Sequence, residues 1–230
     1  MSSRPELKLD WCSRAAAKYA VEHWHYSKSL PVPPCNYLGC WESDGFIGVL
    51  VFSRGTARHG AAEYGLKHTE FVELTRIAFR KHFAPVSRVL SIAFNLVKRL
   101  NPGLRLIVSF ADPNQGHLGV IYQASNCCFV GQKQPTVEYV GPDGKQWHSR
   151  MVSPTGSKKV FGRYRPVWKP DQCAKVKLLG KFKYLMPLDP AMRRQIEPLR
   201  KPYPKRVRSV DSDTSANHAE EGGATPTRTL

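Results

Sequence analysis

The sequence lacks a long apolar run, because no segment approaches the roughly 20 apolar residues that a membrane-spanning helix needs. Residues 1–30 also lack the apolar core of a secretory signal. None of the six cysteines forms a Cys-x-x-Cys pair, which excludes a zinc ribbon. We therefore expect a protein of the reducing cytoplasm with free thiols and no membrane role.

Acidic residues are scarce as well, since 18 Asp and Glu stand against 35 Lys and Arg and give a formal net charge of +17. Residues 145–208 carry most of the excess, with 18 Lys and Arg against 3 Asp and Glu. Such a basic segment, interleaved with aromatic residues, predicts a nucleic-acid partner. The cations expected to contact it are Lys158, Lys159, Arg163, Arg165, Lys169, Lys181 and Lys183.

The apolar periodicity predicts an α/β layered fold in which strands and helices alternate. The clearest expected elements are a strand over 7–11, a helix over 13–27, a hairpin over 36–55, a strand over 69–80 and a helix over 85–100. The expected limits are 1–152 for the layered domain, 153–208 for a basic, aromatic-rich extension and 209–230 for a disordered tail.

The segment SFADPNQGHLGVIYQASN, residues 109–126, places polar side chains where a buried strand ends. Asp112 lies at the edge where open α/β sheets bind ligands, so it is a candidate base, substrate ligand or metal ligand. An Asx turn is the alternative role for this aspartate. Tyr122 is a candidate for the same cleft, and His117 is either a helix cap or a phosphate contact.

The strand expected over 69–80 contains a charge among apolar residues. Side-chain alternation places Glu73 and Arg76 on opposite faces, with Arg76 on the face of Leu74. A guanidinium in that position requires an anion or a carboxylate. An ion pair with Asp112 is the structural alternative to a functional role.

Near the end of the first expected helix, the sequence HWHYSKS offers His25 and Tyr26. An imidazole, a phenol and a carboxylate together form a ligand set that could hold ferrous iron. Packing or simple exposure is the alternative, because the spacing matches no known metal motif.

No glycine-rich phosphate cradle is present in the sequence. The loop after the 69–80 strand is KHFAPVSRVLS, residues 81–91. In it Ser87 is a candidate N-cap, and Ser91 lies one turn further into the helix.

The order of elements resembles the GNAT (N-acetyltransferase-like) fold, a mixed and mostly antiparallel sheet flanked by helices. The combination of HY at 25–26, ELTR at 73–76 and VSFADPNQGHLGVIYQASN at 108–126 with a basic tail resembles the phage Mom family. This resemblance covers residues 10–150. It implies an enzyme that converts the exocyclic amine of adenine in DNA to a methylcarbamoyl derivative and so protects phage DNA from host restriction.

The resemblance also implies which residues form the site. It assigns catalytic roles to Tyr26, Arg76, Ser91, Asp112 and Tyr122. It implies iron as a cofactor, with the ligands His25, Tyr26 and Asp112. The residues expected to contact the substrate are Glu73, His117 and Asn126.

The donor of the transferred group stays open at this point. Members of the acetyltransferase fold hold the CoA pyrophosphate on a loop of the pattern Arg/Gln-x-x-Gly-x-Gly/Ala, and residues 82–91 lack those glycines. Simple acetyl transfer would also give a different product, so acetyl-CoA and another acyl or glycyl donor are both retained. The alternative functions are a CoA-dependent N-acyltransferase for a protein, tRNA or small amine, and a non-catalytic DNA-binding protein. A monomer and a homodimer are equally compatible with the sequence.

Overall fold

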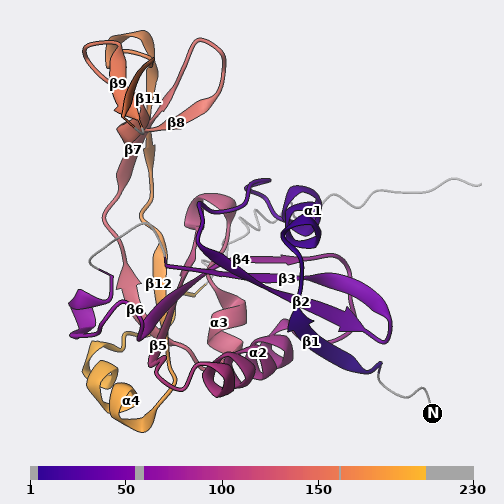
Figure 1. Cartoon of the computed structure of the whole chain (residues 1–230). Coiled ribbons are helices and arrows are strands. Elements are labelled where there is room, and N and C mark those ends of the chain that lie inside the picture. Colours follow the sequence, from indigo (N-terminus) through magenta and orange to yellow (C-terminus); the bar gives the residue numbers. More distant parts are fainter. Residues whose placement is uncertain (1–4, 55–59, 161, 206–230) are drawn as a thin grey trace, which may run out of the picture.

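The computed structural model describes residues 5–54, 60–160 and 162–205, so the tail expected over 209–230 lies outside the described residues. A seven-stranded sheet forms the centre, in the order β1-β2-β3-β4-β5-β12-β6 (Figure 1). Neighbouring strands are antiparallel except β4 and β5, which are parallel. The predicted α/β class with a mostly antiparallel sheet is therefore confirmed. The strands are β1 (Leu7–Trp11), β2 (Cys35–Glu42), β3 (Gly45–Ser53), β4 (Phe71–Phe79), β5 (Leu106–Ala111), β6 (Cys128–Gln132) and β12 (Phe182–Pro187).

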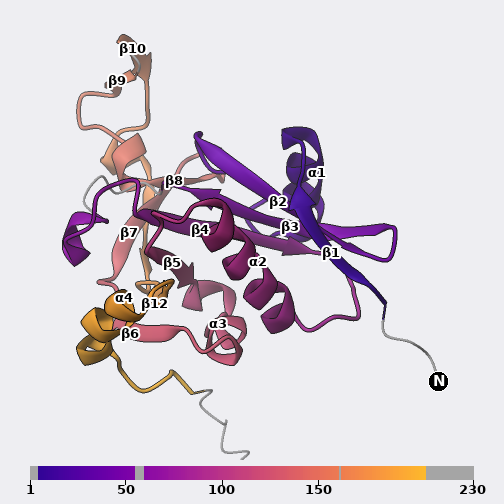
Figure 2. The same ribbon diagram turned by 60° about the horizontal axis from the view of Figure 1, so that its bottom comes forward.

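Helices cover both faces of this sheet (Figures 1 and 2). α2 and α3 pack on one face, in a core cluster with Leu74 and Ile107. α1 packs on the opposite face against Val49 and Val51, and α4 covers that face further along, over β5 and β12. Among the residues described, no helix is long and apolar enough to cross a bilayer. The helices are α1 (Arg14–Trp24), α2 (Val86–Leu100), α3 (Val120–Ala124) and α4 (Pro190–Ile196), with 3-10 turns η1 (Ala62–Tyr64), η2 (Pro113–Gln115), η3 (Ser149–Met151), η4 (Pro170–Gln172) and η5 (Glu197–Leu199).

The two long helices form for the reasons that their sequences indicate. The Ser13 hydroxyl accepts the N–H of Ala16 at 3.2 Å and caps α1. α2 follows Pro85, so the expected cap Ser87 lies inside the helix. The buried stripe of α2 has helical spacing and consists of Val89, Leu90, Ala93, Phe94 and Val97.

A β-bulge in β4 changes which residues share a face of the sheet. Val51 lies opposite Arg76, whereas the next residue of β3 lies opposite Leu74, so Thr75 is left over. The Thr75 hydroxyl donates to the carbonyl of Val51 at 3.0 Å. The extra residue shifts the alternation and brings Arg76 to the same face as Glu73. The expectation of opposite faces is wrong because it assumed an unbroken strand.

The parallel strands β4 and β5 are paired over only part of their length. Their register ends with the pair Leu74 and Ser109. Beyond this pair, β4 continues to Phe79 and β5 continues to Ala111. We call the pair Leu74 and Ser109 the divergence point, because the two strands separate after it.

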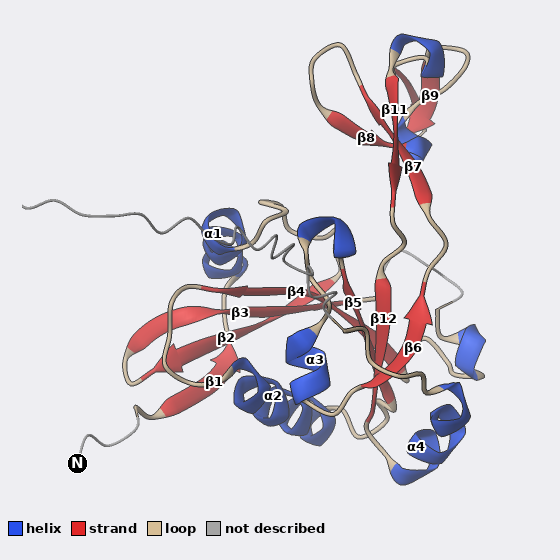
Figure 3. Ribbon diagram, turned by 180° about the vertical axis from the view of Figure 1, so that it is seen from behind, coloured by secondary structure: helices blue, strands red, loops and turns tan. Residues whose placement is uncertain are grey.

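An arm, residues 136–178, projects from one end of the main sheet (Figures 1 and 3). It extends two neighbouring strands, because β6 leads into β7 and β11 leads into β12. The two segments that connect the arm to the sheet approach each other closely, because a Cβ on Gly180 would lie 1.7 Å from the carbonyl oxygen of Lys133. The strands of the arm are β7 (Thr136–Val140), β8 (Gln146–His148), β9 (Ser157–Val160), β10 (Arg163–Pro166) and β11 (Ala174–Leu178).

The domain boundary expected at residue 152 does not coincide with a boundary between structural units. That boundary falls between β8 and β9, inside the arm. β12, which was expected to belong to the basic extension, lies between β5 and β6 in the main sheet. Periodicity alone does not locate such a strand, since its neighbours come from distant parts of the chain.

The cysteines are free thiols, as expected, and three of them are buried. Burial raises the pKa of the Cys12 thiol to about 11. Burial is also the largest cause that raises the pKa of the Cys127 thiol to about 12. Neither thiol is therefore ionised near neutral pH, which disfavours a nucleophilic role for them.

Gly119 tests the packing between α3 and β12. It precedes α3 with a φ of 73°, and a Cβ there would lie 2.4 Å from Cε2 of Tyr184. Gly119→Ala should lower the free energy of unfolding by about 2–4 kcal/mol, because backbone strain and overpacking add. In the control Gly116→Ala, φ is 68° but nothing lies within 4 Å of the Cβ, so a loss of about 1 kcal/mol is expected. Urea denaturation measures both losses, and equal values would contradict this packing.

Candidate active site

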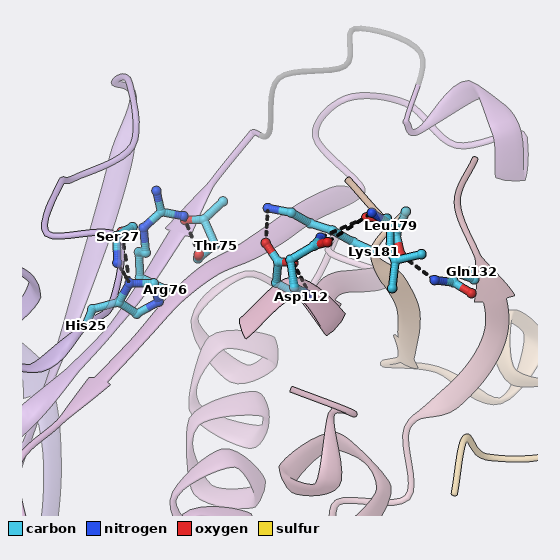
Figure 4. A network of polar contacts seen from close by, with 10 residues as sticks. His25, Ser27, Thr75, Arg76, Asp112, Gln132, Leu179 and Lys181 are labelled. Atoms are coloured by element: carbon cyan, nitrogen blue, oxygen red, sulfur yellow. Dashed lines mark hydrogen bonds and ion pairs between the residues drawn. The ribbon is translucent and has the colours of Figure 1, made fainter. Parts of the chain in front are cut away.

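Predicted site residues from separate segments meet on the face of the sheet between α1 and α4 (Figure 4). Arg76 comes from β4, Asp112 follows β5, and His25 follows α1. Lys181 enters from the root of the arm. The divergence of β4 and β5 places the first two side chains beyond the last paired residues of both strands.

Asp112 forms the Asx turn that was considered as its alternative role. Oδ1 accepts the backbone N–H of Asn114 at 3.0 Å and the side-chain amide of the same residue at 2.9 Å. Oδ2 lies 3.5 Å from Nζ of Lys181, and the Asp112 side chain is 13% exposed. The turn is compatible with a functional role, because it fixes one carboxylate oxygen and leaves the other with a single long ion pair.

Arg76 connects β4 to the segment after α1. Nε donates to the carbonyl of Ser29 at 3.2 Å, and Nη1 donates to the carbonyl of Thr75 at 2.8 Å. In the described ranges Arg76 has no carboxylate within ion-pair distance, so the alternative pairing with Asp112 is not formed. Burial lowers the pKa of Arg76 and nearby acidic groups oppose this, so the guanidinium stays charged and keeps donors for an anion.

Three aromatic rings lie in a row at this site. The rings of His25 and Tyr26 stack with centroids 4.3 Å apart, and the Tyr26 ring lies 5.5 Å from that of His117. Nδ1 of His25 accepts the backbone N–H of Ser27 at 3.0 Å. Burial, followed by the charge of Arg76, lowers the pKa of His25 to about 4, so this imidazole is neutral at pH 7. Tyr26 is 46% exposed and can receive a planar ligand.

Glu73 adds a carboxylate to the same face of the sheet. Burial raises its pKa, and the positive charges of Lys133, Lys181 and Arg76 oppose this shift. The site therefore combines the carboxyl groups of Asp112 and Glu73 with the cations Lys133, Lys181 and Arg76. Positive and negative groups of a ligand can both find a partner of opposite charge there.

Tyr122 lies on the other face, within the core between the sheet and α2. Its hydroxyl oxygen is 2.7 Å from Oγ of Ser109, which donates to the carbonyl of Leu74 at 2.7 Å. Because a carbonyl only accepts, Ser109 uses its one proton there and Tyr122 donates to Ser109. The Tyr122 hydroxyl is thus tied to the divergence point from the core side of the sheet. The sequence analysis missed Ser109, whose only sign is a hydroxyl inside an apolar strand.

Several predicted residues lie apart from this group. Ser91 is exposed on α2, outside its buried stripe, and Asn126 is exposed with a φ of 60° in the turn after α3. Lys183 is 9% exposed, and its Nζ lies 2.6 Å from Oε1 of Glu63. This ion pair with Glu63, whose side chain is 57% exposed, already engages the ammonium group that was expected to contact nucleic acid. The predicted cations on the arm are Lys158, Lys159, Arg163, Arg165 and Lys169.

The described residues give no support to the predicted iron centre. Within residues 5–54, 60–160 and 162–205, no group of three or more His, Cys, Asp or Glu is arranged to hold a metal ion.

The chain resembles known proteins in sequence and in shape. It is 25% identical over 210 residues to Methylcarbamoylase mom of Escherichia phage Mu, an alignment that covers 87% of this chain and 84% of that protein. A solved structure of yncA, a putative acetyltransferase from Salmonella typhimurium, covers 80% of this chain and 95% of its own at a TM-score of 0.46 and 12% identity. A putative acetyltransferase from Acinetobacter baylyi covers 82% and 96% at a TM-score of 0.44 and 14% identity.

A family model also matches most of the chain. The model of the Mom protein family matches residues 6–205. This range contains every described strand and helix, including the arm that the sequence-based resemblance over 10–150 only partly covered. The chain therefore belongs to the Mom protein family.

Proposed function

We propose that this protein is a transferase that converts the exocyclic amine of adenine in DNA to a methylcarbamoyl derivative and so protects phage DNA from restriction in the host cytoplasm. The main support is the convergence of Asp112, Arg76 and Tyr26 beside the divergence point. The similarity to a methylcarbamoylase of a phage supports the transferred group, and the basic arm supports DNA as the substrate.

The target base has to leave the double helix before it can react, because the adenine amine is paired inside duplex DNA. An extruded base needs an apolar, planar surface on which to stack. The rings of Tyr26 and His117 offer such a surface next to Asp112, since His117 follows the Asp112 turn directly.

Asp112 is the group suited to activate the amine. The amine loses a proton as its new bond forms, and a carboxylate that accepts a hydrogen bond from it makes the nitrogen more nucleophilic. Oδ1 of Asp112 is held by Asn114, so Oδ2 is the oxygen available for this role.

Arg76 is suited to hold the donor. Ser29 and Thr75 take two of its N–H groups, and the remaining ones can bind an oxygen on which negative charge develops. A fixed cation in a partly buried place stabilises such charge more than a solvated one does.

The arm is suited to hold the DNA backbone. Residues 136–178 contain nine Lys and Arg against three Asp and Glu. The β9–β10 hairpin gathers several of these cations around Tyr164, which is 75% exposed. Cations bind phosphates irrespective of sequence, and an exposed tyrosine can stack on a base.

The first prediction concerns the modification itself. DNA from cells that express the protein should contain a deoxyadenosine heavier than normal, and Asp112→Asn should reduce it at least about 100-fold because the amine loses its proton acceptor. Mass spectrometry of digested nucleosides measures both. Asp44→Asn, at an exposed turn, is the matched control and should leave the modified fraction unchanged. Unmodified DNA from soluble wild-type protein would argue for the CoA-dependent acyltransferase instead.

The second prediction concerns the arm. Arg163→Gln with Arg165→Gln should weaken DNA binding about tenfold or more and reduce the slope of log affinity against log salt by about 2, since two phosphate contacts are lost. Arg193→Gln with Arg194→Gln removes the same charge from exposed positions of α4 and should change neither value appreciably. Fluorescence anisotropy at several salt concentrations provides the measurement, and equal losses in the two double variants would contradict a role specific to the arm.

The third prediction concerns the protonation of His25. Because its pKa is lowered from 6.5 to about 4, its contribution to stability is present above about pH 6.5 and is lost as the pH falls towards 4. The imidazole resonances should therefore not titrate between pH 5 and 8. NMR of the wild type over this pH range provides the measurement, and a His25 imidazole that titrates near pH 6.5 would contradict the prediction.

A further inference from the structure

The side chain of Glu42, from a distant strand, accepts hydrogen bonds from backbone N–H groups in the loop between β4 and α2. Glu42 ends β2, yet its carboxylate reaches this loop. Oε1 accepts the N–H of Phe83 at 3.0 Å and that of Ala84 at 2.5 Å, and Oε2 accepts the N–H of Phe83 at 2.9 Å. Two consecutive amides are thus bound by one carboxylate of the chain itself.

This carboxylate is ionised in the fold. Burial opposes its ionisation, but the N–H groups of Phe83 and Ala84 and the charges of His82 and Arg80 outweigh it and lower the pKa of Glu42. A negative charge therefore stands just before the N-terminus of α2, where the helix dipole stabilises an anion.

The backbone after Ala84 offers few amides to a second anion, although Lys81 and Arg88 are exposed cations of the loop and of the first turn. Pro85, the N-cap of α2, has no N–H to donate. Only the first-turn amides of Val86 and Ser87 have no acceptor within the helix. A pyrophosphate needs several converging amides and no competing negative charge.

We infer that Glu42 closes the N-terminal end of α2 to phosphates, so that the donor of this enzyme is not anchored there by a CoA pyrophosphate. Two amides of the loop are occupied, the next residue has none, and the bound carboxylate repels an arriving phosphate. The cofactor that the acetyltransferase-like fold implies thus does not fit these residues. This inference concerns the donor site alone and does not depend on DNA being the substrate.

Calorimetric titration of the full-length protein with CoA and with inorganic pyrophosphate tests the inference. The wild type should bind pyrophosphate weakly, and Glu42→Ala should bind it at least tenfold more tightly because the amides are released and the charge is removed. Glu42→Gln keeps one acceptor oxygen for these amides and removes only the charge, so a smaller gain is expected. Glu22→Gln, at an exposed carboxylate of α1 that pairs with Lys18, is the matched control and should match the wild type. A folded Glu42 variant without any gain would overturn the inference.

NMR of the wild type keeps the test decisive if the Glu42 variants do not fold. The backbone amide resonances of Phe83 and Ala84 should stay in place when CoA is added up to millimolar concentration. CoA binding that leaves both resonances unmoved also supports closure, because the ligand then binds elsewhere. Saturable shifts of both resonances at micromolar CoA would show that the ligand displaces Glu42, and the inference would fail.

Discussion

The hydrogen bond from Ser109 to the carbonyl of Leu74 is the interaction on which the candidate site depends. It joins the last paired residues of the two parallel strands. The Tyr122 hydroxyl forms a hydrogen bond with Ser109 from the α2 side of the sheet. Beyond it, the bulge at Thr75 turns Arg76 towards the face of α1. The other strand ends within three residues in the Asp112 turn, so both polar groups take their positions from this one junction.

Local sequence predicted the elements well, because their causes are local. Apolar periodicity located α2 and β5, and the Asp-Pro-Asn-Gln-Gly segment indicated the turn at Asp112. The failures have distant causes instead. The bulge at Thr75 exists only in the pairing with β3, and the partners of Lys183 and Glu42 lie 120 and 41 residues away, beyond the reach of local pattern analysis.

The cations of the chain fall into two groups that composition alone does not separate. Lys183, in the main sheet, is paired with Glu63, and Lys181, just before β12, is paired with Asp112. On the β9–β10 hairpin, Arg163 and Arg165 lie exposed. The exposed cations of this hairpin thus lie apart from the cations that are engaged in ion pairs.

The path of the chain through the arm has a consequence for how the protein can be shortened. β12 is the strand between β5 and β6, although it follows the arm in sequence. A fragment that stops at residue 152 would therefore expose two new strand edges, which invite aggregation. The arm behaves as an insertion into a hairpin, so excising 136–178 and rejoining β6 to β12 through a short turn is the deletion that preserves the sheet.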